Sequence, residues 1–231
     1  MVYSFVYEFC LKIIKILGLF VPKIKGFLNS RARILNDIRN FSNSKNNFII
    51  WVHCSSMGEF EQIKPLLKKI KKTKPITEFV ITFFSKSGFS SAKKFSHAKI
   101  ITYLPFDRKK DLNHFINKIK PKALLLVKNE FWPNLINCVH NADIKIFSIS
   151  STFRKSQLFF NFFSFGMVSV LKKINYFFVV NENDKLLLET LNISSVQVTG
   201  DTRFDRVLEN YTNDSKDKKI TKFLKDSNNF V

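Results

Sequence analysis

Cysteine and histidine are scarce in this sequence of 231 residues, and their placement argues against two kinds of site. The three cysteines lie far apart in the chain, so they form neither a disulfide framework nor a metal knuckle, and a reducing compartment is favoured. The four histidines lack the spacing of metal ligands, which argues against a metal site built from them. These seven residues are Cys10, Cys54, Cys138, His53, His97, His114 and His140.

Acidic residues are also few, since 18 Asp and Glu stand against 38 Lys and Arg and leave a net charge of +20. Such a charge predicts an anionic partner: nucleic acid, a nucleotide, a phosphorylated lipid or a membrane surface. Seven of the basic residues are Arg, and the abundance of Lys, Phe, Ile and Asn is typical of AT-rich codons, which offers a second explanation for part of the charge. No RNP-like, zinc-finger or helix-turn-helix pattern is present, so nucleic acid is the least favoured partner.

A long apolar run free of charges is missing at the N-terminus. Residues 2–21 are mostly apolar, but Glu8, Lys12 and Lys15 interrupt them, whereas a membrane-spanning helix needs about 20 apolar residues with few charges. The order of charges and the lack of a small-residue cleavage site argue against a secretory signal. The three charged residues share one face of a helix, on which Glu8 and Lys12 form a favourable pair.

The rest of that helix surface is broad and apolar, formed by Phe5, Val6, Phe9, Ile13, Ile16, Leu17 and Phe20. This pattern predicts an amphipathic segment over residues 1–40 that lies in the membrane interface, with basic residues that meet lipid phosphates. Those basic residues are Lys23, Lys25, Arg31 and Arg33. The alternative is a helix packed against a neighbouring domain.

From residue 48 on, apolar runs alternate with helical patterns. We expect strands over 48–54, 78–84, 98–104, 123–129, 144–150, 176–181 and 196–200. We expect helices over 59–72, 88–96, 108–119, 133–141, 157–174 and 182–191. This alternation predicts an α/β domain over 45–208 with a Rossmann-like, doubly wound parallel sheet whose continuous apolar strands are covered on both faces.

In such a sheet, ligands bind beyond the carboxyl ends of the strands, and polar residues follow the predicted strands here. The segment after the first strand holds the candidate base Glu59, which we expect to project into an open groove near residues 130 and 203. For each residue a structural role is the alternative: a glycine suits a tight turn, an acid suits a first helical turn, and a tryptophan suits a core. The candidate binding residues at this edge are Ser55, Ser56, Gly58, Trp132 and Arg154.

Four blocks of the sequence, taken in order, resemble a known family. They are WVHCSSMGEFEQIKPLL, YLPFDRKKDLNHFINKIKP, KNEFWPNLI and VTGDTRFDRV, within residues 51–207. The chain is similar to lipid A Kdo transferases, which are 3-deoxy-D-manno-octulosonic acid transferases, over almost its whole length. The resemblance implies the N-terminal, acceptor-binding domain of a GT-B glycosyltransferase, in which two Rossmann-like domains face each other across a cleft.

The resemblance also implies an activity. The family moves Kdo from CMP-Kdo to a lipid A precursor with inversion and without a metal or other cofactor, in lipopolysaccharide synthesis on the cytoplasmic face of the inner membrane. The family's catalytic glutamate corresponds to Glu59, the acid of its Glu-x-Trp-Pro block to Glu130, and a basic residue to Arg203. Asp201 and Arg203 stand where the family commonly has Asn and Lys. The planar guanidinium of Arg has several N–H donors in a fixed geometry, whereas the ammonium of Lys is a compact point charge.

Members of the family are longer than this chain, so the resemblance implies that residues 209–231 form a linker and the start of a missing donor-binding domain. The expected partners are the lipid A precursor and an anionic membrane surface, with CMP-Kdo only if a second domain is supplied. We expect the isolated chain to have negligible transfer activity. The alternatives are a non-catalytic remnant that binds the lipid A precursor at the membrane and, less favoured, a basic nucleic-acid-binding protein.

Overall fold

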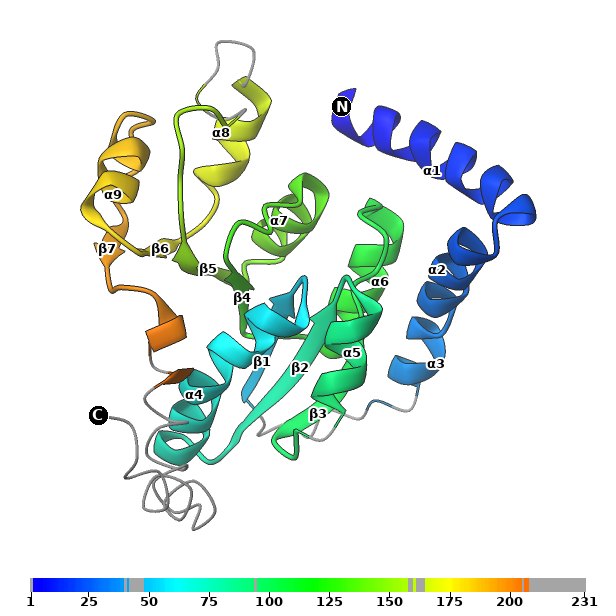
Figure 1. The fold of residues 1–231 in the computed structure, drawn as a ribbon, viewed down its shortest axis with the longest axis horizontal. Helices are drawn as coiled ribbons and strands as arrows, with labels where there is room; N and C mark the ends of the chain where they lie inside the picture. Colours follow the sequence, from blue (N-terminus) through cyan, green and yellow to red (C-terminus); the bar gives the residue numbers. More distant parts are fainter. Residues whose placement is uncertain are drawn as a thin grey trace, which may run out of the picture.

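The computed structural model describes residues 2–39, 41, 48–93, 95–157, 160, 165–204, 206 and 207, and a parallel sheet forms its centre (Figure 1). Its seven strands are β1 (Phe48–Cys54), β2 (Thr77–Phe83), β3 (Ala98–Tyr103), β4 (Ala123–Val127), β5 (Lys145–Ser151), β6 (Tyr176–Val179) and β7 (Val196–Val198). Their order in the sheet is β3-β2-β1-β4-β5-β6-β7, and every neighbouring pair is parallel. The predicted Rossmann-like, doubly wound fold class is confirmed.

The chain reverses its direction of travel across the sheet between β1 and β4. From β1 it moves outward through β2 to β3, and it then returns to place β4 on the other side of β1. A crevice forms beyond the carboxyl ends of strands at such a switch point, because the connections leave it on opposite faces. The segments that follow β1 and β4 therefore meet at the ligand-binding position of this fold.

Helices cover both faces of the sheet (Figure 1). Side chains alternate along each strand, so Trp51 packs into one core while Val52 packs into the other. The second core is covered by α4 (Met57–Thr73) and α5 (Lys86–Ala92). Helices of the first core are α3 (Ile34–Arg39), α6 (Lys109–Ile119), α7 (Pro133–Asn141), α8 (Phe165–Leu171) and α9 (Glu182–Glu189).

Helix α1 (Val2–Phe20) is attached to the domain by polar contacts on one side, and α2 (Pro22–Ala32) follows it. The hydroxyl of Tyr3 donates to Asp107 Oδ2 at 2.8 Å, and Arg108 Nε donates to Glu8 Oε1 at 2.9 Å. We expected Glu8 to pair with Lys12, but its carboxylate reaches across to Arg108, the N-cap residue before α6. Tertiary contacts therefore use the polar face that the sequence indicated.

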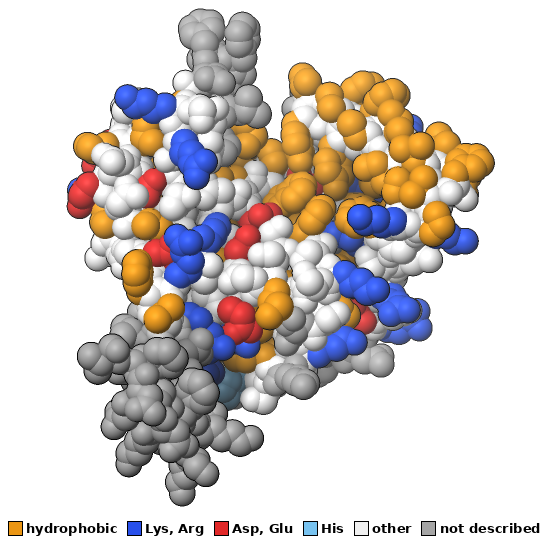
Figure 2. All heavy atoms as spheres, viewed as in Figure 1, with side chains coloured by type: hydrophobic (Ala, Val, Ile, Leu, Met, Phe, Trp, Pro, Cys, Tyr) orange, Lys and Arg blue, Asp and Glu red, His pale blue; other side chains and the backbone are white. Residues whose placement is uncertain are grey.

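The remaining surface of α1 is exposed. All seven apolar side chains predicted there have exposed fractions between 42% for Ile13 and 78% for Phe20. Figure 2 shows this surface as a broad hydrophobic area over α1, with Lys and Arg gathered below it over α2. Within the described residues, no helix is long and apolar enough to cross a membrane. Among the described residues this face has no packing partner, so the membrane interface and the packing against a neighbouring domain both stay predictions.

The element boundaries agree with the predictions to within a few residues, with one exception. The helix predicted over 157–174 is represented by α8, while 158–159 and 161–164 lie outside the described residues. Most of the predicted linker over 41–47 and all of 209–231 also lie outside them.

Candidate functional site at the carboxyl ends of β1 and β4

Glu59 lies in the first turn of α4, directly after β1. Ser56 caps this helix, since its Oγ accepts a hydrogen bond from the Glu59 backbone N–H at 3.4 Å. The Glu59 carboxylate folds back and accepts a hydrogen bond from the backbone N–H of Ser55. The half-buried side chain is thus held against its own turn, instead of projecting freely into a groove as we expected.

Glu130 follows β4 and comes from the other side of the switch point. Its Oε2 accepts a hydrogen bond from Trp132 Nε1 at 2.9 Å and lies 3.6 Å from Nε2 of His53. At 3.6 Å the contact with His53 is an ion-pair distance and too long for a hydrogen bond. The carboxylate is thereby fixed between an indole N–H and an imidazole ring.

His53 is completely buried at the end of β1, and its functional position was not predicted. Its Nδ1 lies 3.1 Å from both the carbonyl oxygen and the hydroxyl of Thr82, its register partner on β2. Nδ1 can donate to the Thr82 carbonyl oxygen, which leaves a lone pair on Nε2, or accept from the Thr82 hydroxyl, which leaves an N–H on Nε2. Either group can therefore face Glu130. Among the described residues, Nε2 has no hydrogen-bond partner, which leaves Glu130 as the group that it faces.

The two carboxyl groups have opposite pKa shifts. Burial raises the pKa of Glu59, and the negative charge of Glu130 raises it further, although the Ser55 N–H and His53 act in the opposite direction. Burial also acts to raise the pKa of Glu130, but His53, Trp132 and Ser55 together hold that pKa below its ordinary value. A carboxylate that is ionised beside one that retains its proton more readily is a common acid-base arrangement.

The wall around the two carboxylates is built from neighbouring loops. Trp132 stacks on Phe84 with ring centroids 5.4 Å apart, so its half-buried ring orients the N–H toward Glu130. Gly58 is exposed and has open space where a side chain would be, which leaves its backbone accessible to a ligand.

Two predicted residues lie apart from these carboxylates. Arg203 pairs with Asp201, with Nε and Nη2 both 2.7 Å from Oδ2, and 65% of its side chain is exposed. Arg154 lies in an exposed turn, where its backbone N–H donates to Gln157. The structure brings Ser55, Glu59, Glu130 and Trp132 together and places neither arginine in contact with them among the described residues.

Sequence reasoning treated His53 only as a possible metal ligand. The available signal was its position at the end of an apolar strand, two residues before the Ser55-Ser56 turn and on the same strand face as Trp51. Thr82 is likewise a polar residue near the end of an apolar strand, β2. The described residues contain no group of three or more His, Cys, Asp or Glu side chains that could hold a metal ion.

Comparison with known proteins agrees with this architecture. The family model of 3-deoxy-D-manno-octulosonic-acid transferase (kdotransferase) matches residues 28–206. A bifunctional glycosyltransferase/methyltransferase of Fusobacterium nucleatum is 35% identical over 208 residues, which is 87% of this chain and 31% of that protein. The 3-deoxy-D-manno-octulosonic acid transferase of Aquifex aeolicus is 38% identical over 88 residues, 38% of this chain and 24% of that enzyme. The chain thus spans about a third or less of these two curated relatives.

Solved structures share the fold at low sequence identity. A UDP-GlcNAc 2-epimerase from Methanocaldococcus jannaschii, in complex with UDP-GlcNAc and UDP, superposes with a TM-score of 0.58 at 14% identity, covering 78% of this chain and 54% of that chain. The Neisseria meningitidis UDP-GlcNAc 2-epimerase gives a TM-score of 0.56 at 16% identity, covering 78% and 53%. These likenesses establish the fold alone. The match of the family model across most of the sheet, with Glu59 and Glu130 inside it, shows that this chain belongs to the 3-deoxy-D-manno-octulosonic-acid transferase family.

Proposed function

We propose that this chain is the acceptor-binding half of a glycosyltransferase that moves Kdo from CMP-Kdo to a lipid A precursor. The observation that carries the proposal is the meeting of Glu59 and Glu130 at the switch point between β1 and β4, where doubly wound sheets bind their ligands. The family membership supplies the reaction class. The donor nucleotide is proposed to bind to a second domain, because the chain spans a minority of its relatives' length.

In the proposed reaction, a hydroxyl oxygen of the acceptor forms a bond to the anomeric carbon of Kdo. The bond from that carbon to the phosphate oxygen of CMP breaks, and CMP leaves with the electron pair. The hydroxyl proton passes to the Glu59 carboxylate, which acts as general base. A raised pKa suits this role, because a stronger base accepts the proton more readily.

Glu130 is proposed to act beside the base rather than as the base. Held ionised by His53 and Trp132, it orients the acceptor hydroxyl and stabilises positive charge that develops on the sugar ring. Arg203 is proposed to contact the leaving phosphate, for which its exposed guanidinium is available at the same edge of the sheet. Ser55, Ser56, Gly58 and Arg154 are proposed binding residues for the acceptor sugar, and no metal or other cofactor is invoked.

The exposed apolar face of α1 is proposed to lie in a membrane interface, as expected for an enzyme with a lipid acceptor. We propose that this membrane is the inner membrane and that the chain lies on its cytoplasmic face, as the resemblance to the family implies. The basic residues of α2 then lie toward the anionic surface.

A reconstitution assay tests the proposal. The purified chain is mixed with CMP-Kdo and lipid A precursor, with and without a separately expressed C-terminal half of a Kdo transferase, and the product is measured by mass spectrometry. We expect the lipid to gain Kdo only in the complete mixture. Glu59→Gln should lower the rate by about 10² or more, because it removes the general base.

Glu61→Gln is the matched control. Glu61 lies two residues further along α4 and pairs with Lys64 and, at 2.8 Å, with Arg206, so it takes no part in the site. We expect its rate to stay near that of the parent chain. Equal loss in both variants, or product from the complete mixture containing Glu59→Gln at the parent rate, would contradict the role of Glu59. Binding of the lipid without transfer in any mixture would instead support the non-catalytic alternative.

A further inference from the structure

Behind the Glu130 carboxylate, three side chains with polar atoms are completely buried in the sheet. They are Trp51 and His53 on β1 and Thr82 on β2, each with an exposed fraction of 0%. Thr82 is the register partner of His53, and Trp51 lies on the same face of β1 as His53. Burying an imidazole ring and a hydroxyl costs free energy unless both form hydrogen bonds, so the few partners within reach decide how they are arranged.

The hydroxyl of Thr82 lies at the centre of this group. Trp51 Nε1 is 2.9 Å from Thr82 Oγ1, and because an indole nitrogen can only donate, the hydroxyl oxygen accepts this hydrogen bond. The Trp51 ring packs against the ring of Phe115 on α6, with centroids 4.8 Å apart, which keeps the indole N–H in place. The hydroxyl proton of Thr82 is therefore left for a different acceptor.

That proton has two acceptors within reach. His53 Nδ1 lies 3.1 Å from Thr82 Oγ1, whereas the carbonyl oxygen of Val52 lies 3.5 Å away. The shorter contact makes the better hydrogen bond, so the hydroxyl donates to Nδ1. A ring nitrogen that accepts a hydrogen bond carries no hydrogen, and the ring proton of His53 then lies on Nε2.

The Glu130 carboxylate gives an independent reason for the same tautomer. His53 Nε2 lies 3.6 Å from Glu130 Oε2 and has no hydrogen-bond partner among the described residues. An N–H on Nε2 is attracted to the carboxylate, whereas a lone pair would face the lone pairs of the carboxylate oxygen and be repelled. The other tautomer, in which Nδ1 donates to the Thr82 carbonyl oxygen at 3.1 Å, creates that repulsion.

Packing alone does not require a hydroxyl on β2. Valine has the same branched shape as threonine and suits a strand equally well, and the neighbours of Thr82 along the strand, Ile81 and Phe83, are buried and apolar. The described contacts of the Thr82 hydroxyl lead to Trp51, Val52 and His53. Its position is thus explained by the hydrogen bond to His53 rather than by the space that it fills.

We propose that Thr82 is a positioning residue of the site: its hydroxyl fixes the ring proton of His53 on Nε2, and this N–H holds the Glu130 carboxylate in place for the acceptor. The inference rests on the proposed function for the part that Glu130 plays in transfer. Thr82 itself touches neither carboxylate in the described contacts and acts through the histidine ring.

The first test locates the ring proton in the full chain. The histidine rings are labelled with ¹⁵N, and the signals of His53 are assigned as those absent from His53→Gln. We expect the chemical shifts of a protonated Nε2 and an unprotonated Nδ1. In Thr82→Val the hydroxyl is gone, so Nδ1 should take the proton and donate it to the carbonyl oxygen of residue 82. A protonated Nδ1 in the parent chain would overturn the proposal.

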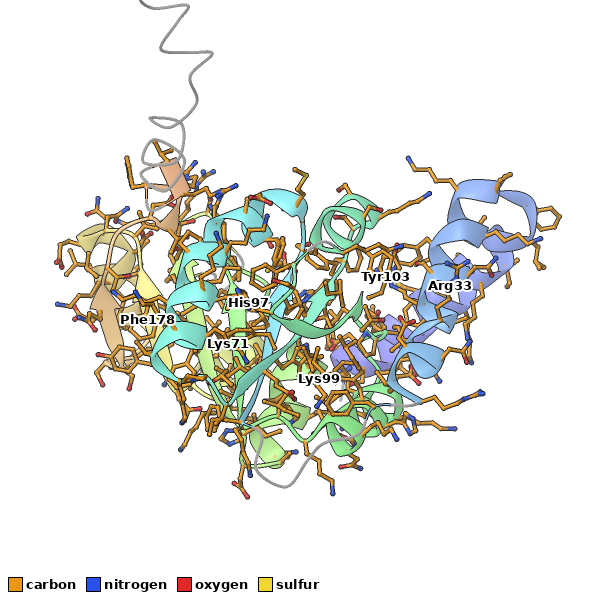
Figure 3. All side chains as sticks on the ribbon, turned by 90° about the horizontal axis from the view of Figure 1, so that it is seen from below. Arg33, Lys71, His97, Lys99, Tyr103 and Phe178 are labelled. Carbon is orange, nitrogen blue, oxygen red and sulfur yellow. The ribbon has the colours of Figure 1, made fainter. Side chains whose placement is uncertain are left out.

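Thr82→Ser and Thr102→Val are the matched controls. The serine keeps a hydroxyl at residue 82 and should keep the proton on Nε2. Thr102 is the register partner of Thr82 on β3, is equally buried, and donates its hydroxyl to Asp37. It directly precedes Tyr103, which Figure 3 shows beside Arg33, where the N-terminal helices meet β3. Thr102→Val therefore removes a buried hydroxyl from the same row of the sheet without touching the His53 ring.

The pKa of Glu130 provides a second measurement, by NMR titration of ¹³C-labelled glutamate carboxyl groups. An N–H that faces the ionised carboxylate lowers its pKa, so Thr82→Val should raise the pKa of Glu130. The other groups that act on or beside this carboxylate, Trp132, Ser55 and Glu59, are the same in all the variants. Thr82→Ser and Thr102→Val should leave the curve unchanged, and equal rises in Thr82→Val and Thr102→Val would overturn the proposal.

The complete transfer mixture separates this inference from the proposed function. Thr82→Val should lower kcat about tenfold or more and leave the KM for the lipid within about twofold, because the wrong tautomer disturbs Glu130 without removing a binding contact. Thr82→Ser should restore most of kcat, and the parent kcat in Thr82→Val would contradict the positioning role. The expected tautomer and pKa changes, with no Kdo transfer in any mixture, would contradict the proposed function alone.

Discussion

At the scale of single residues, the pKa values of Glu59 and Glu130 shift in opposite directions because their partners differ. Glu59 has one strong donor, the Ser55 N–H, while Glu130 faces the buried His53 ring and the Trp132 N–H. The negative charge of Glu130 then makes ionisation of Glu59 harder. The charge of Glu130 thus contributes to the pKa of Glu59, and two groups of the same type acquire different properties.

This coupling predicts opposite effects of two substitutions on the pKa of Glu59. Glu130→Gln removes a negative charge that raises this pKa, so the pKa should fall. His53→Gln removes a contribution that lowers it, so the pKa should rise. The measurement is a pH titration of the full chain followed by NMR of ¹³C-labelled glutamate carboxyl groups.

Glu182→Gln provides the control for that titration, because Glu182 lies at the start of α9 and pairs with Lys185 at 3.9 Å. It should leave the Glu59 curve unchanged. Shifts of the same sign in Glu130→Gln and His53→Gln would show that the two side chains do not act on Glu59 through their charges.

At the scale of elements, two glycines after neighbouring strands have different reasons to be present. A Cβ on Gly88 in α5 would lie 2.4 Å from Phe83 Cδ1 and 3.1 Å from the backbone of Ser56, so the α5 turn can pack on the Glu59 turn only without a side chain. A Cβ on Gly58 would meet open space, with Ser56 Oγ at 3.9 Å. Both glycines lie in the first turn of a helix, but packing requires a glycine only at Gly88.

We therefore expect Gly88→Ala to lower the free energy of unfolding by about 1–3 kcal/mol, as overpacking does in other cores. Gly58→Ala should leave the free energy of unfolding unchanged or raise it by about 0.5 kcal/mol, because alanine favours a helix. Urea denaturation of the two variants in parallel checks both values. Similar losses in both would mean that the close approach of α5 to Ser56 does not exist in solution.

The strands could be predicted from the sequence because their apolar runs are continuous and end at polar turns. The predicted range 48–54 is the range of β1, and the run over 123–127 is fully buried as β4. The partner of Glu8 could not be predicted, because Arg108 lies 100 residues away and local spacing favoured Lys12. Periodicity gives the face of a helix but not the element that packs on it.

The site could be predicted in part for the same reason. Glu59 and Glu130 follow strands, so the rule for doubly wound sheets indicated them before their contacts were known. His53 was missed because a histidine within an apolar strand gives no sign of the carboxylate it will face. The ion pair of Arg203 with Asp201 was also missed, although the two residues are only two positions apart in a loop.

At the scale of the whole molecule, apolar and basic surfaces lie next to each other on one side. Figure 2 shows the hydrophobic area of α1 beside the Lys and Arg side chains over α2. In the proposed function, a lipid whose chains lie against α1 would meet the basic side chains of α2 with its headgroup. The apolar surface of α1 and the basic surface of α2 would thus contact a membrane together.

This arrangement predicts that one exposed phenylalanine of α1 matters for membrane binding and another elsewhere does not. Phe5 on α1 and Phe204 at the opposite end of the described chain are 76% and 72% exposed, so replacing either by Asp should change the free energy of unfolding by no more than about 0.5 kcal/mol. Burial of a phenylalanine side chain in an apolar medium contributes about 1.5–3 kcal/mol, so Phe5→Asp should weaken binding to phosphatidylcholine vesicles by about tenfold or more. Phe204→Asp should sediment with the vesicles as the parent chain does. Equal sedimentation of the two variants would show that α1 does not enter the membrane, and its apolar face would then require a protein partner.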